Sequence, residues 1–306
     1  MRILLIHCLL FSLFSHSPAH ADEGLLAKEK LVAWCIVPFD ASKRGPEERA
    51  VMLKELGLKK CAYDWRAEHI PTFEAEILAY KKHGIEFFAF WSVHEEAFKL
   101  FEKHKIHPQI WTMIPGPKGP SQAEKIKQAV AALKPLAERT KQINCPLSLY
   151  NHGGWQGEPA NMVAVCQGLR DAGYDHVGIV YNFHHGHEHI EDWATLFKLM
   201  QPYLHCLNIN GMSENAQPKI LKLGDGKHEL DMLRVVQESG YDGPIGILDH
   251  QGNRDSQEVL TENLEGVEKL KPMLKADESK MSSLKKKLPE SLSSRPSSSP
   301  RPLKTR

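Results

Sequence analysis

Short apolar runs recur along the chain, and each is followed by a segment with the spacing of an amphipathic helix. Eight runs can be counted, at 31–37, 59–64, 85–91, 109–114, 146–150, the first half of 176–190, 203–209 and 244–248. The helical segments after them are predicted at 47–56, 70–82, 95–104, 121–142, 160–172, 190–200, 228–239 and 258–274. Several helices stop at a glycine, as at Gly57, Gly84 and Gly173, which is typical of a helix C-terminus.

The strict alternation of strand and helix predicts a parallel sheet, because parallel neighbours need a crossover connection. The run at 85–91 is almost entirely aromatic and aliphatic, as expected of a strand covered on both faces. Eight parallel strands close into a barrel filled by its own side chains, so we predict an α/β fold, a (β/α)8 TIM barrel. The alternative is a doubly wound open sheet, but no Gly-x-Gly-x-x-Gly motif follows the first run.

Both ends of the chain differ from its body. Residues 1–21 combine Arg2, an apolar segment and Ala-His-Ala at 19–21, which predicts a cleaved signal peptide and a secreted or periplasmic protein. The apolar segment is shorter than the ~20 residues of a membrane span, so we expect no transmembrane span in the mature chain. Residues 276–306 are rich in Ser, Pro and Lys and offer no apolar face, which predicts a disordered basic tail. The barrel domain is predicted at 22–275.

Charge and cysteine content narrow the choice of partners. The tail carries 8 Lys and Arg against 3 Asp and Glu, whereas the body is mildly acidic. An acidic body argues against nucleic acid as a partner of the folded domain. Cys8 falls in the leader, and the other cysteines lie in apolar surroundings that favour free buried thiols. Cys35 and Cys61 are in neighbouring predicted strands and are the pair to test for a disulfide.

The predicted strand ends carry the candidate chemistry, because catalytic residues of a (β/α)8 barrel lie at the C-terminal face. Polar and aromatic side chains gather there: Asp40, Asp64, Arg66, Trp91, His94, Asn151, His152, Trp155, Asn182, His184, His185, Asn208, Asn210, Asp249 and His250. Aromatic faces beside many hydrogen-bonding groups suit a small-molecule carbohydrate, because sugar faces stack and hydroxyls need donors and acceptors. Taken singly, each residue could instead cap a helix or form an internal pair.

The sixth run leads into a loop that is rich in histidine. Asn182 and His185 are expected to point towards the site, whereas His187 and His189 are expected to begin the next helix or to face water. A histidine-rich loop is often only polar surface or an adventitious metal trap. Its position at a strand end is what favours a functional interpretation.

Four motifs give the sequence a family resemblance. They are Tyr-Asn-His-Gly-Gly-Trp at 150–155, Tyr-Asn-Phe-His-His-Gly-His at 181–187, Asn-Ile-Asn-Gly-Met at 208–212 and Leu-Gly-Asp-Gly-Lys-His-Glu-Leu at 223–230. Together with the eight-unit pattern, they resemble the xylose isomerase-like TIM barrel family of sugar isomerases and epimerases. The resemblance covers most of 30–274 and is more specific for fold than for reaction.

The resemblance implies one divalent metal, such as Mn, Mg, Zn or Co, bound at the ends of strands five to eight mainly by Glu, Asp and His. The matching positions here hold Asn151-His152, Asn182 with nearby His185, Asn208 and Asp249. Neutral amides replace carboxylates poorly around a dication, so the metal site is expected to be weakened or lost. Two forms stay open: a three-ligand site of His152, His185 and Asp249, or no metal.

These expectations lead to a sugar isomerase or epimerase that moves a proton next to a carbonyl, with His152, His185 and Asp249 as catalytic residues. Without a metal, either histidine could act as general base, because imidazole titrates near neutrality, while Asn182 and Asn208 donate to an enediolate oxygen. The alternatives are a carbohydrate-binding barrel without catalysis and a lyase or hydrolase acting on an oxidised glycoside. The oligomeric state is not indicated by the sequence.

Overall fold

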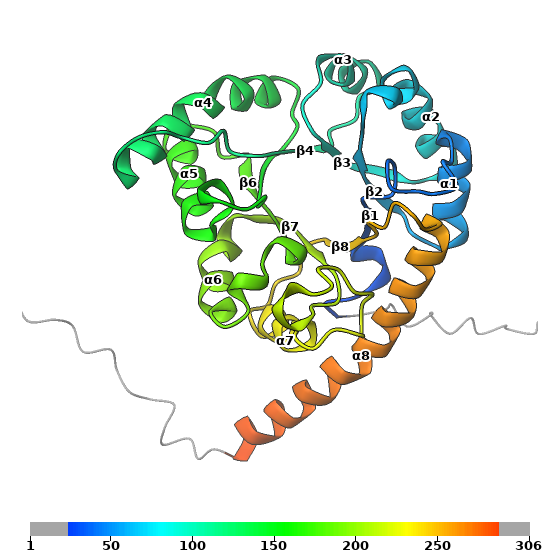
Figure 1. Cartoon of the computed structure of the whole chain (residues 1–306), viewed down its shortest axis with the longest axis vertical. Helices are drawn as coiled ribbons and strands as arrows, with labels where there is room; N and C mark the ends of the chain where they lie inside the picture. Colours follow the sequence, from blue (N-terminus) through cyan, green and yellow to red (C-terminus); the bar gives the residue numbers. More distant parts are fainter. Residues whose placement is uncertain (1–23, 288–306) are drawn as a thin grey trace, which may run out of the picture.

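The computed structural model of the protein describes residues 24–287. Eight parallel strands form one closed barrel in chain order, and helices surround it (Figure 1). The strands are β1 Leu31–Trp34, β2 Lys60–Asp64, β3 Glu86–Trp91, β4 Gln109–Thr112, β5 Leu147–Tyr150, β6 Val177–Asn182, β7 Leu204–Ile209 and β8 Ile245–Leu248. The predicted (β/α)8 barrel is therefore confirmed.

One α-helix follows each strand on the outside of the barrel. The helices are α1 Pro46–Glu55, α2 Phe73–His83, α3 Glu95–His104, α4 Gln122–Gln142, α5 Pro159–Asp171, α6 Trp193–Met200, α7 Glu229–Glu238 and α8 Ser256–Lys287. Gly84 ends α2 with φ 69°, the left-handed conformation that its position in the sequence predicted.

The two ends of the chain bear on the predicted domain boundaries. The predicted signal peptide at 1–21 and the part of the tail beyond residue 287 lie outside the described residues. The sequence placed the end of the last helix at 274 and a disordered tail from 276, whereas α8 continues through 276–287. Neither Pro nor Gly occurs between 276 and 287, so nothing in the local sequence breaks the helix there.

Side chains of each strand alternate between the barrel interior and the surrounding helices. In β1, Val32 and Trp34 belong to the interior cluster, whereas Leu31 belongs to the cluster under the helices. Aromatic rings fill the interior: the ring centroids of Trp34 and Trp111 are 4.7 Å apart, and those of Trp111 and Tyr150 are 6.3 Å apart. The interior of the barrel is therefore a packed core.

Two glycines make room for large side chains on β7. A Cβ at Gly178 on β6 would overlap the imidazole of His205, and a Cβ at Gly246 on β8 would overlap the side-chain oxygen of Asn208. His205 crosses the interior, where its Nδ1 lies 2.9 Å from Ser148 Oγ on β5. These glycines are therefore sites of close packing and not points of flexibility.

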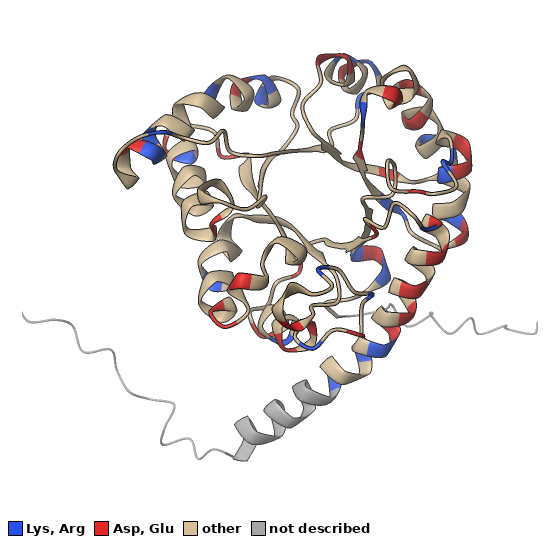
Figure 2. Cartoon of the chain, in the orientation of Figure 1, with Lys and Arg blue, Asp and Glu red and all other residues tan. Residues whose placement is uncertain are grey.

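Charged residues lie mainly on the helices and loops around the barrel (Figure 2). No helix within residues 24–287 is long and apolar enough to cross a membrane. The cysteines in this range are buried and free. Cys35 belongs to the interior cluster, whereas Cys61 lies in the outer cluster and accepts a hydrogen bond from Tyr80 Oη at 3.1 Å. The disulfide considered for Cys35 and Cys61 is thus absent from this structure.

Candidate active site at the barrel mouth

Three buried asparagines, here called the amide chain, link the ends of β5, β6 and β7. Asn182 Nδ2 donates to Asn151 Oδ1 at 2.9 Å, and Asn208 Nδ2 donates to Asn182 Oδ1 at 2.7 Å. The backbone N–H of Asn182 also donates to Asn151 Oδ1, at 2.8 Å, and Asn151 Nδ2 donates to the backbone carbonyl of Asn182. The Cys206 thiol donates to Asn208 Oδ1 at 3.4 Å. Every side-chain oxygen of the amide chain therefore already accepts a hydrogen bond.

The amide chain occupies positions where the family resemblance implies metal ligands. Its residues are at most 1% exposed, and their oxygens are neutral and already engaged. A divalent ion prefers charged oxygens or free imidazole nitrogens. The residues present therefore do not fit a metal at these positions. The role of Asn182 and Asn208 as hydrogen-bond donors to an enediolate oxygen stays a prediction.

Two buried carboxyl groups lie at the exits of β2 and β8. Asp64 Oδ1 accepts a hydrogen bond from the Val37 N–H at 3.3 Å, and its Oδ2 is buried without a hydrogen-bond partner. Asp249 accepts hydrogen bonds from the Ser256 hydroxyl and from the Gln251 N–H. Burial raises the pKa of both carboxyl groups to about 7. Each group therefore carries a proton part of the time at neutral pH.

Asp249 is thus held at the start of α8 and not beside the predicted metal ligands His152 and His185. Glu158, Glu188 and His189 form the group that could hold a metal ion among residues 24–287. The ligand atoms of these three side chains all lie within 4.8 Å of one another. The structure does not assemble His152, His185 and Asp249 into a three-ligand site, because the Ser256 hydroxyl and the Gln251 amide hold the Asp249 carboxylate.

Imidazoles from the loops after β5 and β6 form the centre of the mouth. The ring centroids of His152 and His185 are 4.6 Å apart, and those of His184 and His185 are 3.8 Å apart. Lys219, from the loop after β7, places its Nζ 3.3 Å from His185 Nδ1. An ammonium group can only donate, so Nδ1 of His185 is the acceptor and its proton resides on Nε2.

The charge state of these imidazoles follows from their surroundings. Burial, together with Lys219 and the neighbouring imidazoles, lowers the pKa of His185 to about 3. Burial also lowers the pKa of His184 well below its ordinary value. The sequence suggested His185 as a general base that titrates near neutrality, but a group with this pKa is too weak a base for that task. A neutral imidazole can still donate a hydrogen bond through its N–H.

Aromatic side chains complete the mouth on both sides of the imidazoles. Trp91 at the end of β3 is half-buried, and its ring centroid lies 4.4 Å from that of Tyr150. Across the mouth, His250 stacks on Phe39 at 4.0 Å, and the Arg66 guanidinium lies 5.5 Å from the centre of the same phenyl ring. His250 has a φ of 49°, in the left-handed region that few residues other than glycine adopt.

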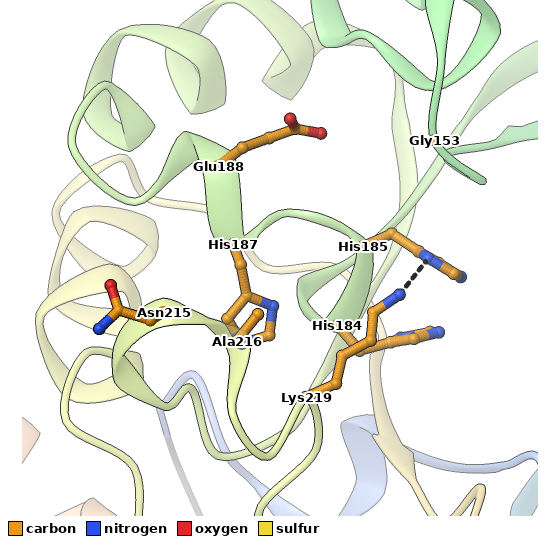
Figure 3. A pocket seen from close by; sticks show the side chains of 8 residues that line it. All are labelled: Gly153, His184, His185, His187, Glu188, Asn215, Ala216 and Lys219. Carbon is orange, nitrogen blue, oxygen red and sulfur yellow. Dashed lines mark hydrogen bonds between the residues drawn. The ribbon is translucent and has the colours of Figure 1, made fainter.

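A cavity of about 430 Å³ opens beside the imidazoles (Figure 3). It is lined by Gly153, His184, His185, His187, Glu188, Asn215, Ala216 and Lys219. His187 begins the short 3-10 helix η5 His187–His189, as the sequence suggested, and it also lines the cavity. Volumes of about 300–1,000 Å³ are typical of small-molecule sites, so the cavity is large enough for a monosaccharide.

Glu188 of the cavity lining belongs to the group of Glu158, Glu188 and His189. His189 Nε2 is 3.2 Å from Glu158 Oε2, and His189 Nδ1 is 3.3 Å from Asp192 Oδ1. Both ring nitrogens therefore face carboxylates. Within the described residues, this group of side chains could hold a cation. Its member Glu188 is exposed to solvent.

Three predicted binding residues are engaged elsewhere. His94 caps α3, where its Nδ1 accepts from the Glu96 N–H at 3.2 Å. The indole N–H of Trp155 donates to Gln122 Oε1 at 2.8 Å, beside the start of α4. Asn210 is buried and donates to the carbonyl of the next residue at 2.9 Å. Local capping and loop anchoring account for these residues, and no contact joins them to the cavity.

Comparison with known proteins adds information on the fold. No protein-family model matches the sequence, and no curated protein matches it. A xylose isomerase domain containing protein from Salmonella typhimurium LT2 has a TM-score of 0.61 at 14% identity, covering 79% of this chain and 97% of that one. The 3-keto-D-glucoside 4-epimerase of E. coli has a TM-score of 0.59 at 13% identity, with coverages of 79% and 100%. The IOLI protein, solved with a zinc atom, gives 0.60 at 12% identity, with coverages of 79% and 97%.

At these identities the likeness establishes the fold. The chain has the xylose isomerase-like (β/α)8 fold, which is what its four motifs predicted. One of the similar structures contains zinc. In this chain, the amide oxygens at the ends of β5, β6 and β7 are already engaged in hydrogen bonds.

Two residues of the mouth were not identified from the sequence. Lys219 lies in the loop between β7 and α7, which has no periodic pattern, and Phe39 follows β1 without a polar signal. The one signal that could have pointed to Lys219 is the position of its loop, because loops after the last strands of a (β/α)8 barrel often bind phosphate. Their contacts with His185 and His250 became visible only in the folded chain.

Proposed function

We propose that the chain is a sugar isomerase- or epimerase-like enzyme that moves a proton next to a carbonyl, without a metal at the amide-chain positions. The observation that carries this proposal is the contact of Lys219 Nζ with His185 Nδ1, beside His152. A neutral imidazole N–H backed by an ammonium group suits the negative charge that develops on a carbonyl oxygen during enolisation.

In this proposal, His152 and His185 have different roles. His152 is exposed at the mouth and acts as the base that removes the proton next to the carbonyl. His185 keeps its proton on Nε2 and donates it as a hydrogen bond to the carbonyl oxygen. Lys219 fixes this tautomer through Nδ1 and adds a positive charge close to the developing oxyanion.

The metal implied by the resemblance is disfavoured at His185 by its surroundings as well as by the amide chain. A histidine that binds a metal usually donates its second ring N–H to a carboxylate or carbonyl. Here the second nitrogen of His185 faces an ammonium group. A cation at this position repels a dication, whereas it assists an oxyanion.

Sugar binding is supported by the aromatic groups and the cavity. Trp91, which is half-buried at the end of β3 and packs on the buried Tyr150, offers a ring at the mouth, and the cavity beside His185 has the volume of a monosaccharide site. The structural neighbours whose names include sugar epimerase and isomerase activities share this fold, which is compatible with the same reaction class.

Exchange with deuterated solvent tests the proposal. The full chain is incubated in D2O with a panel of ketoses, aldoses and uronic acids, and deuterium next to the carbonyl is followed by proton NMR. We expect exchange for at least one sugar, with a decrease of about 100-fold or more in His152→Ala and in His185→Ala. His83→Ala, on the outer helix α2, is the matched control and should retain the rate. Unchanged rates in both mouth variants would refute the assigned roles.

Two other functions are distinguished by the same panel. A carbohydrate-binding barrel without catalysis is favoured by the asparagines of the amide chain, which stand where the family resemblance implies metal ligands. Such a protein would bind a sugar without exchanging its proton for deuterium. A lyase acting on an oxidised glycoside would use the same proton abstraction but would release an unsaturated product, which absorbs in the ultraviolet.

We also propose that the protein is exported, to the periplasm or the medium. The support is the pattern of residues 1–21, with a basic start, an apolar segment and Ala-His-Ala at 19–21. N-terminal sequencing of the protein from its native cells should give a chain beginning at Asp22. A chain that retains Met1 would contradict this proposal.

A further inference from the structure

Lys219 presents an unpaired positive charge to the cavity. Its Nζ contacts the neutral ring of His185, and it makes no ion pair with any carboxylate of residues 24–287. By contrast, Lys222 and Lys227 in the same loop pair with Asp225 and Glu214. The ammonium group that faces the cavity is thus left with a free capacity for an anion.

His184 supplies an independent indication of a ligand. It is 3% exposed, lines the same cavity, and its Nδ1 is buried without a hydrogen-bond partner. A buried ring nitrogen without a partner costs free energy, and an occupant of the cavity could remove this cost. The His184 ring lies 3.8 Å from that of His185, and His184 and Lys219 line the same cavity.

The acidic groups near the cavity do not neutralise this pair. Glu188 is the carboxylate in the lining, and it lies on the opposite side of the cavity from Lys219 (Figure 3). Glu188 is grouped with Glu158 and His189. The side of the cavity formed by Lys219, His184 and His185 is therefore positive or neutral, with hydrogen-bond donors.

We propose that the substrate is a sugar acid whose carboxylate binds between Lys219 and His184. This inference rests on the proposed function and names its substrate class. A carboxylate accepts from the ammonium group of Lys219 and from the Nδ1–H of His184. A single lysine with neutral imidazoles suits one negative charge, whereas phosphate sites usually have arginine forks or the N-terminus of a regular helix. The carbonyl end of the sugar then lies towards His152 and His185.

Calorimetric titration of the full chain tests the inference with matched pairs: D-glucuronate against D-glucose, and D-galacturonate against D-galactose. We expect at least one acid to bind about tenfold or more tightly than its neutral partner, because a hydrogen bond to a charged group carries this preference. Lys219→Gln should abolish the preference. Lys222→Gln, whose ammonium pairs with Asp225 in the same loop, is the control and should retain it.

Three outcomes would overturn the inference. The acids could bind no more tightly than their neutral partners, the preference could survive in Lys219→Gln, or D-glucose 6-phosphate could bind more tightly than the acid. Lys219 is exposed, so its replacement does not threaten folding. The titration measures sugar binding and does not depend on turnover. An acid preference without proton exchange would therefore contradict the proposed function alone, and exchange confined to neutral sugars would contradict this inference alone.

Discussion

Replacing Asn182 by Asp tests the amide chain, because it restores the residue type that the family resemblance implies while keeping the size of the side chain. The Asn182 amide donates to Asn151 Oδ1 at 2.9 Å and accepts from Asn208 Nδ2 at 2.7 Å. An ionised Asp keeps the second hydrogen bond and loses the first. The substitution also places a carboxylate oxygen against Asn151 Oδ1, so that two acceptors face each other at a position that is 0% exposed.

The magnitude follows from this loss. A buried group left without its partner costs about 1–3 kcal/mol, and a charged one costs more, so we expect a destabilisation of about 3 kcal/mol at pH 8. For a domain of this size, about 2–4 °C in Tm corresponds to each kcal/mol, which gives a decrease of about 6–12 °C. Burial raises the pKa of such a carboxyl group, and the protonated form can again donate to Asn151. The defect should therefore shrink as the pH falls to 5.

Thermal unfolding followed by circular dichroism, at pH 5 and pH 8 with a chelator present, measures this effect. Asn253→Asp, at an exposed position in the loop before α8, is the matched control and should change Tm little. If Asn182→Asp were as stable as the unaltered protein at pH 8, the amide chain would not be the buried and closed arrangement described here.

Two further substitutions test neighbouring features. Asp64 has a folded-state pKa of about 7, which is above its unfolded value. Between about pH 4 and 7, the Asp64 carboxyl group is therefore protonated in the folded state and ionised in the unfolded state. The free energy of unfolding falls as the pH rises through this range, by at most about 1.4 kcal/mol per pH unit from this group. Urea unfolding across this range should show a shallower decline in Asp64→Asn, and an unchanged slope would show that Asp64 is ionised in the fold. Gly246→Ala inserts a methyl group against Asn208 and should cost about 1–3 kcal/mol in the same assay. Gly116→Ala is the control and should be nearly neutral, because Gly116 is exposed and the nearest atom to an added Cβ is 4.0 Å away. Equal stabilities of the two variants would contradict the close packing on β7.

The fold was predictable because its signal is repeated along the chain. Each apolar run is long enough to be identified alone, and the glycine stops, such as Gly84, mark helix ends by a backbone requirement that few other residues meet. The ends of elements were less predictable: β1 ends at Trp34, although the apolar run continues to Val37. Burial continues past the last ladder hydrogen bond there, and hydrophobicity reports burial and not pairing.

The sequence predicted where the candidate site lies, but it did not predict the role of each residue there. The strand ends do carry the polar residues, but whether a polar residue faces a cavity or a backbone group depends on distances of a few ångströms that no local pattern contains. His94 serves as a helix cap, and Asp249 is held by Ser256, although both follow strands as catalytic residues do. Lys219 shows the converse, because its role depends on a contact with His185 from a different loop.

Metal analysis combined with turnover tests the central claim most directly. The purified full chain is treated with a chelator, its Zn, Mn, Mg and Co content is measured by mass spectrometry, and solvent deuterium exchange is then recorded for the accepted sugar. If His152 moves the proton and His185 and Lys219 stabilise the oxyanion without a metal, the rate will be the same with and without metal. Loss of exchange on chelation, restored by one equivalent of a divalent metal, would contradict the account.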